Sequence, residues 1–78
     1  MNKQDFLNQL EGVELSKLTH IVTITQLPTG AREVAINTER LEEKVEYIKN
    51  TYNEEMIHKY SRSKENELPV QILSIALA

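Results

Sequence analysis

The sequence contains no cysteine, only two glycines, and a single aspartate, Asp5. Without cysteine the chain can form no disulfide, no thiolate zinc site and no cysteine nucleophile. Two glycines, Gly12 and Gly30, are too few for a glycine-rich phosphate-binding loop. These absences remove several classes of catalytic and metal site before any motif is considered.

Length leaves oligomerisation as the expected source of extra stability. A chain of 78 residues forms one domain, residues 1–78, and buries only about 60–65% of its unfolded surface. Small domains usually add disulfides, a metal or a second subunit. Disulfides are excluded, and the two histidines, His20 and His58, lie far apart in the sequence. We therefore expect a homodimer or a higher homo-oligomer.

The acidic residues do not form a recognisable catalytic set. Half of the twelve acids fall within one expected helix, on its outer face, whereas catalysis needs carboxylates held in a cleft. The segment "EMIH", Glu55 to His58, has the Glu-x-x-His spacing of di-iron bundles, but one chain supplies only one copy. We favour a solvated helix face there. The sequence predicts a protein that is not an enzyme and uses no metal or other cofactor.

Charge and hydropathy indicate where the chain acts. A net charge of −3 and a pI near 5.3 disfavour nonspecific binding to nucleic acid or to an anionic membrane. The N-terminal residues lack the apolar core of a signal peptide, and the final apolar run is about half the length that spans a bilayer. We expect a cytoplasmic protein that has no membrane partner.

The first half of the chain predicts a helix followed by a β-hairpin. Residues 3–11 fit a short helix that ends at Gly12. Residues 20–26 and 32–36 are β-branched and alternate in polarity, and Pro28 and Gly30 suit the turn between them. We expect one buried face and one half-polar face. The expected buried residues are Val22, Ile24, Val34 and Ile36; the opposite face holds Thr23, Thr25, Glu33 and Ala35.

Residues 39–60 predict one long helix with an N-cap at Asn37 or Thr38. Its apolar positions recur at helical spacing, and no proline or glycine interrupts it. A helix of this length spans about 33 Å, which exceeds the roughly 20 Å of the hairpin. Its far end should therefore need a partner. The apolar stripe comprises Leu41, Val45, Ile48, Tyr52 and Met56.

The C-terminal segment "LPVQILSIALA" predicts a third strand from Val70 onward. It lacks polar alternation, which is typical of a strand covered on both faces, here by helices or by another subunit. The strand could pair with its own hairpin or with that of a neighbouring copy. The fold class is α+β in the order α-β-β-α-β, with the hairpin and this strand packed on one long helix. The expected oligomer interface comprises Met56, Ile57, Tyr60, Val70, Ile72, Ile75 and Leu77.

Basic and aromatic residues suggest a modest site for an anionic ligand or partner. Arginine side chains suit phosphate, and a helix N-terminus offers backbone N–H groups. Tyr47 lies opposite the apolar stripe and could stack on a base. The competing interpretation is scattered surface arginines and one interface tyrosine. The candidate residues are Arg32, Arg40, Tyr47, Arg62 and Lys64.

Residues 19–56, "THIVTITQLPTGAREVAINTERLEEKVEYIKNTYNEEM", resemble the small uncharacterised accessory proteins encoded by phages and prophages of Gram-positive bacteria. The hairpin "LPTGAREV" running directly into "NTERLEEKVEYIKNTYNEEM", the small size and the lack of cysteine carry this resemblance. It implies a role in the host cytoplasm, by stoichiometric binding of a host factor or of a small signalling molecule.

Two functions follow as hypotheses. The first is a non-catalytic, homo-oligomeric module that binds and inhibits a bacterial host protein, such as a defence component. The second is a protein that sequesters a nucleotide-like ligand at a subunit junction. Transcriptional regulation is a weaker third option, because no expected helix is basic.

Overall fold

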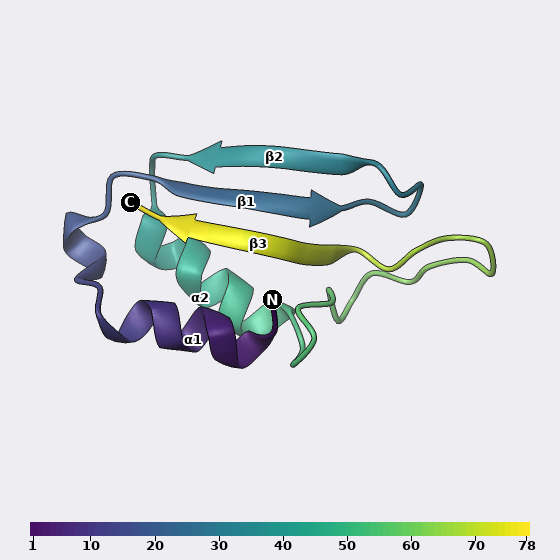
Figure 1. Cartoon of the computed structure of the whole chain (residues 1–78), viewed down its shortest axis with the longest axis horizontal. Helices are drawn as coiled ribbons and strands as arrows, with labels where there is room; N and C mark the ends of the chain where they lie inside the picture. The colour runs from purple at the N-terminus through teal and green to yellow at the C-terminus, as the bar shows by residue number, and fades with distance from the viewer.

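Three strands form one antiparallel sheet in the order β2-β1-β3, and two helices pack on one of its faces (Figure 1). The computed structural model describes residues 1–78. The predicted α+β class and the order α-β-β-α-β are confirmed. The elements are α1 (Lys3–Glu11), a 3₁₀ turn at Leu15–Lys17, β1 (Ile21–Gln26), β2 (Arg32–Asn37), α2 (Leu41–Thr51) and β3 (Gln71–Leu77).

Helix α1 begins with a reciprocal cap. The Asn2 side chain accepts a hydrogen bond from the Asp5 backbone N–H at 2.8 Å, and the Asp5 carboxylate accepts one from the Asn2 N–H at 2.9 Å. Two amides at the helix start are thereby satisfied. The predicted helix over 3–11 is confirmed, with Gly12 as its C-terminal cap.

The hairpin between β1 and β2 closes as predicted. The Leu27 N–H donates to the Ala31 carbonyl at 2.8 Å, and the Gly30 N–H donates to the Leu27 carbonyl at 2.9 Å. Gly30 has φ +89°, a conformation that costs glycine little and other residues more. The turn sets the register of the two strands, in which Ile24 faces Val34.

The predicted buried face of the hairpin is wrong. Ile21 and Thr23 are buried toward the helices, whereas Val34 and Ile36 are 62% and 64% exposed. The sequence has β-branched residues on both faces of β1, so alternation alone did not decide between them. We call the outward surface the open sheet face; by register it comprises Val22, Ile24, Val34, Ile36, Ser74 and Ala76, and at the turn end Gln26 and Arg32.

Helix α2 is shorter than predicted at both ends. The N-cap is Arg40, with φ +52° and no side-chain cap, because Asn37 is still part of β2. The helix ends at Thr51, since Tyr52 adopts extended backbone. The Asn53 side chain then accepts hydrogen bonds from the backbone N–H groups of two following residues, at 2.9 and 3.0 Å. These bonds stabilise a turn in place of the last expected helical turns.

The chain after α2 returns to β3. We call residues 53–58 the return loop. Met56 has φ +62° and a fully buried side chain. The Ile72 N–H donates to the Met56 carbonyl, and the His58 N–H donates to the Val70 carbonyl, both at 2.9 Å. The return loop therefore covers the beginning of the outer edge of β3.

Strand β3 is confirmed, and it pairs with β1 of its own chain. The chain itself covers only one of its faces, and the expected coverage of the other by a second subunit stays a prediction. Ile72 and Ile75 are 3% and 6% exposed, but Ser74 and Ala76 face solvent. The register with β1 shifts between Ile72 and Ser74. A three-stranded sheet with helices on one side leaves its other face uncovered, so β3 is half buried.

The hydrophobic core draws on every part of the fold except β2. Its members come from α1, β1, α2, the chain just beyond α2, and β3. They are Phe6, Ile21, Leu41, Val45, Ile48, Tyr52, Met56, Ile72 and Ile75. Strand β2 is thus held by its ladder with β1 and contributes no buried apolar side chain.

Candidate functional site

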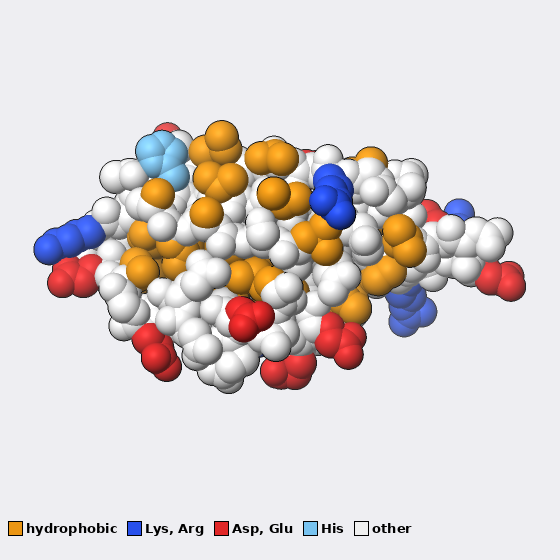
Figure 2. Space-filling view, viewed as in Figure 1, with side chains coloured by type: hydrophobic (Ala, Val, Ile, Leu, Met, Phe, Trp, Pro, Cys, Tyr) orange, Lys and Arg blue, Asp and Glu red, His pale blue; other side chains and the backbone are white.

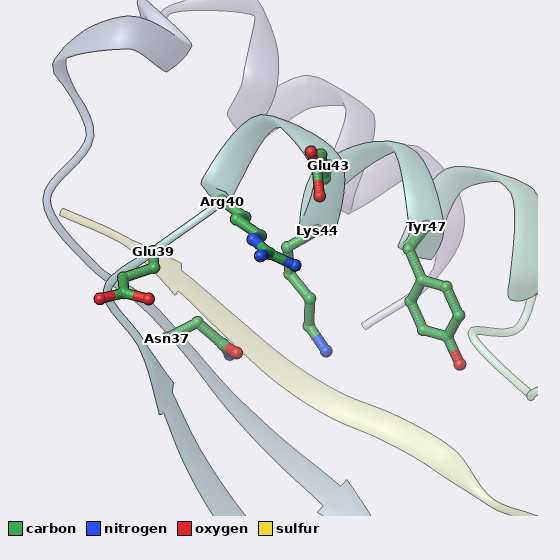
Figure 3. Close-up of a pocket in the computed structure, with 6 residues that line it drawn as sticks. All are labelled: Asn37, Glu39, Arg40, Glu43, Lys44 and Tyr47. Carbon is green, nitrogen blue, oxygen red and sulfur yellow. The ribbon is translucent and has the colours of Figure 1, made fainter.

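A shallow hollow of about 360 Å³ lies where β2 ends and α2 begins. In Figure 3, the side chains of Lys44 and Tyr47 extend from α2, that of Arg40 from the residue just before it, and that of Asn37 from the end of β2. Positions 40, 44 and 47 share one face of a helix because they are four and three residues apart. We call this hollow the α2–β2 pocket; its lining residues are Asn37, Glu39, Arg40, Glu43, Lys44 and Tyr47.

The α2–β2 pocket contains polar groups that lack partners. The chain's only ion pairs are Lys17–Glu14 and Lys49–Glu46, so neither Arg40 nor Lys44 is paired. The Asn37 Nδ2 atom is buried and donates no hydrogen bond. A buried unpaired donor is costly, so a group that accepts from it would be stabilised here.

The N-terminus of α2 adds to the positive character of the pocket. Arg40 caps the helix without a side-chain hydrogen bond, so no side chain satisfies the first-turn amides. The Lys44 ammonium lies 5.3 Å from the centre of the Tyr47 ring, within cation–π range. Glu39 and Glu43 equal the two cations in number, so the side chains that line the pocket carry no net charge.

A row of aromatic rings continues from the pocket toward the return loop. The rings of Tyr47 and Tyr52, then Tyr52 and His58, then His58 and Tyr60 meet edge to face at 6.4, 5.2 and 6.1 Å. Burial, followed by the charges of Tyr47 and Glu33, raises the pKa of Tyr52. Tyr47 is 46% exposed, as its position opposite the apolar stripe indicated.

His58 links this row by two hydrogen bonds. Its Nδ1 atom accepts from the Tyr60 backbone N–H at 3.2 Å, and its Nε2 atom lies 3.3 Å from the Tyr47 hydroxyl. With Nδ1 as an acceptor, the neutral imidazole carries its proton on Nε2 and donates to Tyr47. His58 therefore positions the Tyr47 ring at the rim of the pocket.

The structure brings together only part of the predicted anion site. Arg40 and Tyr47 line the α2–β2 pocket. Arg32 pairs with Gln26 at the opposite end of β2, and Arg62 and Lys64 lie in the exposed loop before β3. The prediction missed Asn37 and Lys44. The helical spacing of Arg40, Lys44 and Tyr47 was a signal that could have found Lys44.

The predicted oligomer interface is distributed between core and surface. Met56, Ile72 and Ile75 are buried in the chain's own core, so they present no surface to a second copy. Ile57, Val70 and Leu77 are partly buried. Tyr60 is 75% exposed. Tyr60 is thus the most accessible member of the set.

The Glu55–His58 segment lies in the return loop, so the helical geometry of a di-iron ligand pair is not formed. No group of three or more histidine, aspartate or glutamate side chains is arranged to hold a metal ion. Neither helix of the fold has the length and apolar character needed to cross a membrane.

No protein-family model matches the chain, and neither a curated protein nor a solved structure matches it. The candidate site therefore depends on the residues and geometry of this chain alone.

Proposed function

We propose that the chain is a small non-catalytic binding module, a phage-encoded accessory protein that acts as a homo-oligomer in the host cytoplasm by binding and inhibiting a bacterial host factor. The observation that supports it is the open sheet face. Val34 and Ile36 keep more than 60% of their surface exposed in a chain of 78 residues. Contiguous exposed apolar surface on a small protein marks an interaction site.

The charge distribution also supports this proposal. The open sheet face carries one charged residue, Arg32, at the end next to the hairpin turn, and its centre is uncharged. In Figure 2, hydrophobic side chains gather over the strands, while the acidic side chains lie along the helices and at the ends of the molecule. A central apolar area with charges around it is the usual composition of a protein-binding surface.

The test is capture of a partner from a bacterial lysate, followed by reconstitution with the purified partner. We expect Ile36→Asp, which places a charge in the middle of the open sheet face, to abolish capture without unfolding the chain. Asn66→Asp, which adds the same charge in an exposed loop, is the matched control. The proposal fails if no protein is enriched, or if both variants capture the partner equally.

A second candidate function is sequestration of a nucleotide-like anion at the α2–β2 pocket. It is favoured by one observation: the pocket unites Arg40 and Tyr47, which suit a phosphate and a base respectively. Its volume lies near the lower limit for small-molecule sites. Thermal unfolding with a panel of mono- and cyclic nucleotides tests this function. A bound ligand raises the melting temperature by mass action, and Arg40→Gln should remove the shift.

A further inference from the structure

Strand β2 is an unprotected sheet edge. Both of its faces are largely exposed, and none of its residues belongs to the core. The charged residues of β2, Arg32 and Glu33, lie at the end next to the turn. From Val34 to Asn37 there is no proline, charged side chain or bulge, the devices that usually keep an edge from pairing. By contrast, the start of the β3 edge is covered by the return loop.

The hairpin closure determines which backbone groups of β2 face outward. The Leu27 N–H donates to the Ala31 carbonyl, which makes these two residues a hydrogen-bonded pair. Hydrogen-bonded and non-hydrogen-bonded pairs alternate along an antiparallel ladder. The backbone groups of Arg32, Val34 and Ile36 therefore point away from β1, free to pair with another strand.

We propose that two copies of the chain join through their β2 strands, antiparallel about a two-fold axis at Ala35, to form a continuous six-stranded sheet. Val34 of each copy then lies opposite the partner's Ile36, and two exposed apolar pairs cover each other. The occupant of the β2 edge is thus a second copy. This inference rests on the homo-oligomeric part of the proposed function.

Charge and apolar pairing together favour this register. With the axis at Ala35, Glu33 lies opposite the partner's Asn37. Moving the axis to Ile36 would place Glu33 opposite the partner's Glu39, which brings like charges together. Moving the axis to Val34 would place Ile36 opposite the partner's Arg32, which removes the pairing of Val34 with Ile36.

The α2–β2 pocket supplies the complementary half of this contact. Cross-strand neighbours point to the same face, so Glu33 and the partner's Asn37 both face the helix side of the sheet. There the buried Asn37 Nδ2 lacks an acceptor, and Arg40 and Lys44 lack ion pairs. A carboxylate satisfies both needs, because it accepts hydrogen bonds and carries negative charge. Each pocket is therefore completed by the Glu33 of the other copy.

The first measurement is sedimentation velocity with native mass spectrometry on the wild-type chain. A single edge-to-edge contact belongs to the weak class of interfaces, so the concentration series runs from about 1 µM to about 1 mM. We expect a species of twice the 9.0 kDa chain mass that grows with concentration. A chain that stays monomeric over this range overturns the inference.

Two variants test the contact without disturbing the core. Glu33→Lys, at an exposed position, should raise the dimer dissociation constant by about tenfold or more, because it faces Arg40 and Lys44 of the partner. Val34→Pro removes an outward N–H while sparing the ladder with β1, and should also give a monomer. The control, Glu65→Lys, makes the same charge change in an exposed loop and should dimerise like the wild type.

A charge exchange gives the sharpest outcome. In a dimer of the Glu33→Lys variant, each new lysine side chain would face the cations of the other copy's pocket. In a dimer of the double variant Arg40→Glu with Lys44→Glu, each Glu33 would face the new carboxylates of the other copy's pocket. Mixed together, the two proteins restore both contacts, so a heterodimer should form with near wild-type affinity. Its absence, with both variants folded by circular dichroism, would overturn the inference.

The outcomes separate this inference from the proposed function. A wild-type dimer that is insensitive to Glu33→Lys and Val34→Pro would retain the homo-oligomer but reject the β2 contact. A monomer that captures a host protein through the open sheet face would retain the binding module and reject the dimer. Binding of a different protein at the β2 edge, in place of a second copy, also rejects the inference.

Discussion

The two edge strands of the sheet, β3 and β2, differ in how much of their surface the rest of the chain covers. The β3 edge is partly covered by the return loop, and its inward residues Ile72 and Ile75 complete the core. The β2 edge is bare, and its apolar residues Val34 and Ile36 face solvent. Yet in sequence the C-terminal segment is the more apolar of the two. The more apolar strand, β3, thus buries its inward side chains within the chain. Strand β2, which has the sequence of an ordinary hairpin strand, leaves its apolar side chains without a partner.

The largest expected effect is the loss of stability caused by a substitution in β3. Ile72→Asp places a carboxylate in the core and should destabilise the chain by about 3–5 kcal/mol. Ile36→Asp, the matched change on β2, should alter stability by about 0.5 kcal/mol or less because the position is exposed. Urea denaturation followed by circular dichroism measures both values. Equal losses for the two variants would contradict the difference between the edges.

A smaller effect concerns Lys3, which holds the end of α2 just before the return loop. Its ammonium donates to the carbonyls of Lys49 and Tyr52, at 2.6 and 2.5 Å. The Lys49 carbonyl lies in the last turn of α2, where the helix leaves carbonyls unpaired, and Tyr52 is the C-terminal cap of the helix. Lys3→Met should cost about 1–3 kcal/mol at pH 7, measured by urea denaturation. Lys17→Met, in an exposed surface ion pair, should cost almost nothing.

The same side chain predicts a pH dependence. Burial, followed by the nearby charge of Lys59, lowers the pKa of Lys3 from its ordinary 10.5, against the opposing effect of Glu54. Between the lowered pKa and 10.5 the unfolded chain holds the proton that the folded chain has released. Stability conferred by Lys3 therefore rises with pH across this window. The stability difference between wild type and Lys3→Met should widen there, and a constant difference would contradict the prediction.

Asn53 tests the return loop itself. Its side-chain oxygen accepts from the backbone N–H groups of Glu55 and Ile57, and Asn53→Ala should cost about 1 kcal/mol. The more specific readout is hydrogen exchange. We expect faster exchange at the Ile72 amide, which bonds to the return loop, with little change along β2. Unchanged protection at Ile72 would mean that the loop covers the β3 edge without this support.

The smallest effect at neutral pH is expected for Tyr52→Phe. Burial raises the pKa of Tyr52 from 10.0, so the unfolded chain loses this proton at lower pH than the folded chain. Stability of the wild type should therefore fall as pH rises above 10. The phenylalanine variant should lack this part of the loss while matching the wild type at pH 7 within about 0.5 kcal/mol. Parallel alkaline denaturation curves for the two proteins would contradict the assignment.

Local signals predicted the elements of the fold well. The turn around Pro28 and Gly30, the helix over 3–11 and the C-terminal strand depend on residue types a few positions apart, and all three are confirmed. The long helix was predicted past its true end at Thr51. Its end is stabilised by the local hydrogen bonds to the Asn53 side chain and by Lys3, from α1, on a last-turn carbonyl.

The face of the sheet and the site depended on contacts that the sequence does not contain. Both faces of β1 carry β-branched residues, and the packing of Ile72 and Ile75 against the helices selected the one with Ile21. Arg40 and Tyr47 were predicted together because arginine suits phosphate and an exposed tyrosine can stack on a base. Asn37 joins them only through the way β2 enters α2, a geometry fixed by the left-handed conformation of Arg40.

The central strand β1 gains its two neighbours over very different lengths of chain. Ile21 meets Asn37 of β2, sixteen positions away, but it also meets Leu77 of β3, 56 positions away. Short loops close faster and at lower entropic cost than long ones. We therefore expect the hairpin to form first during folding and one side of β1 to stay unpaired until β3 arrives. In concentrated refolding mixtures we expect this unpaired side to accept the β3 of another molecule, so that strand exchange between copies competes with folding of the single chain.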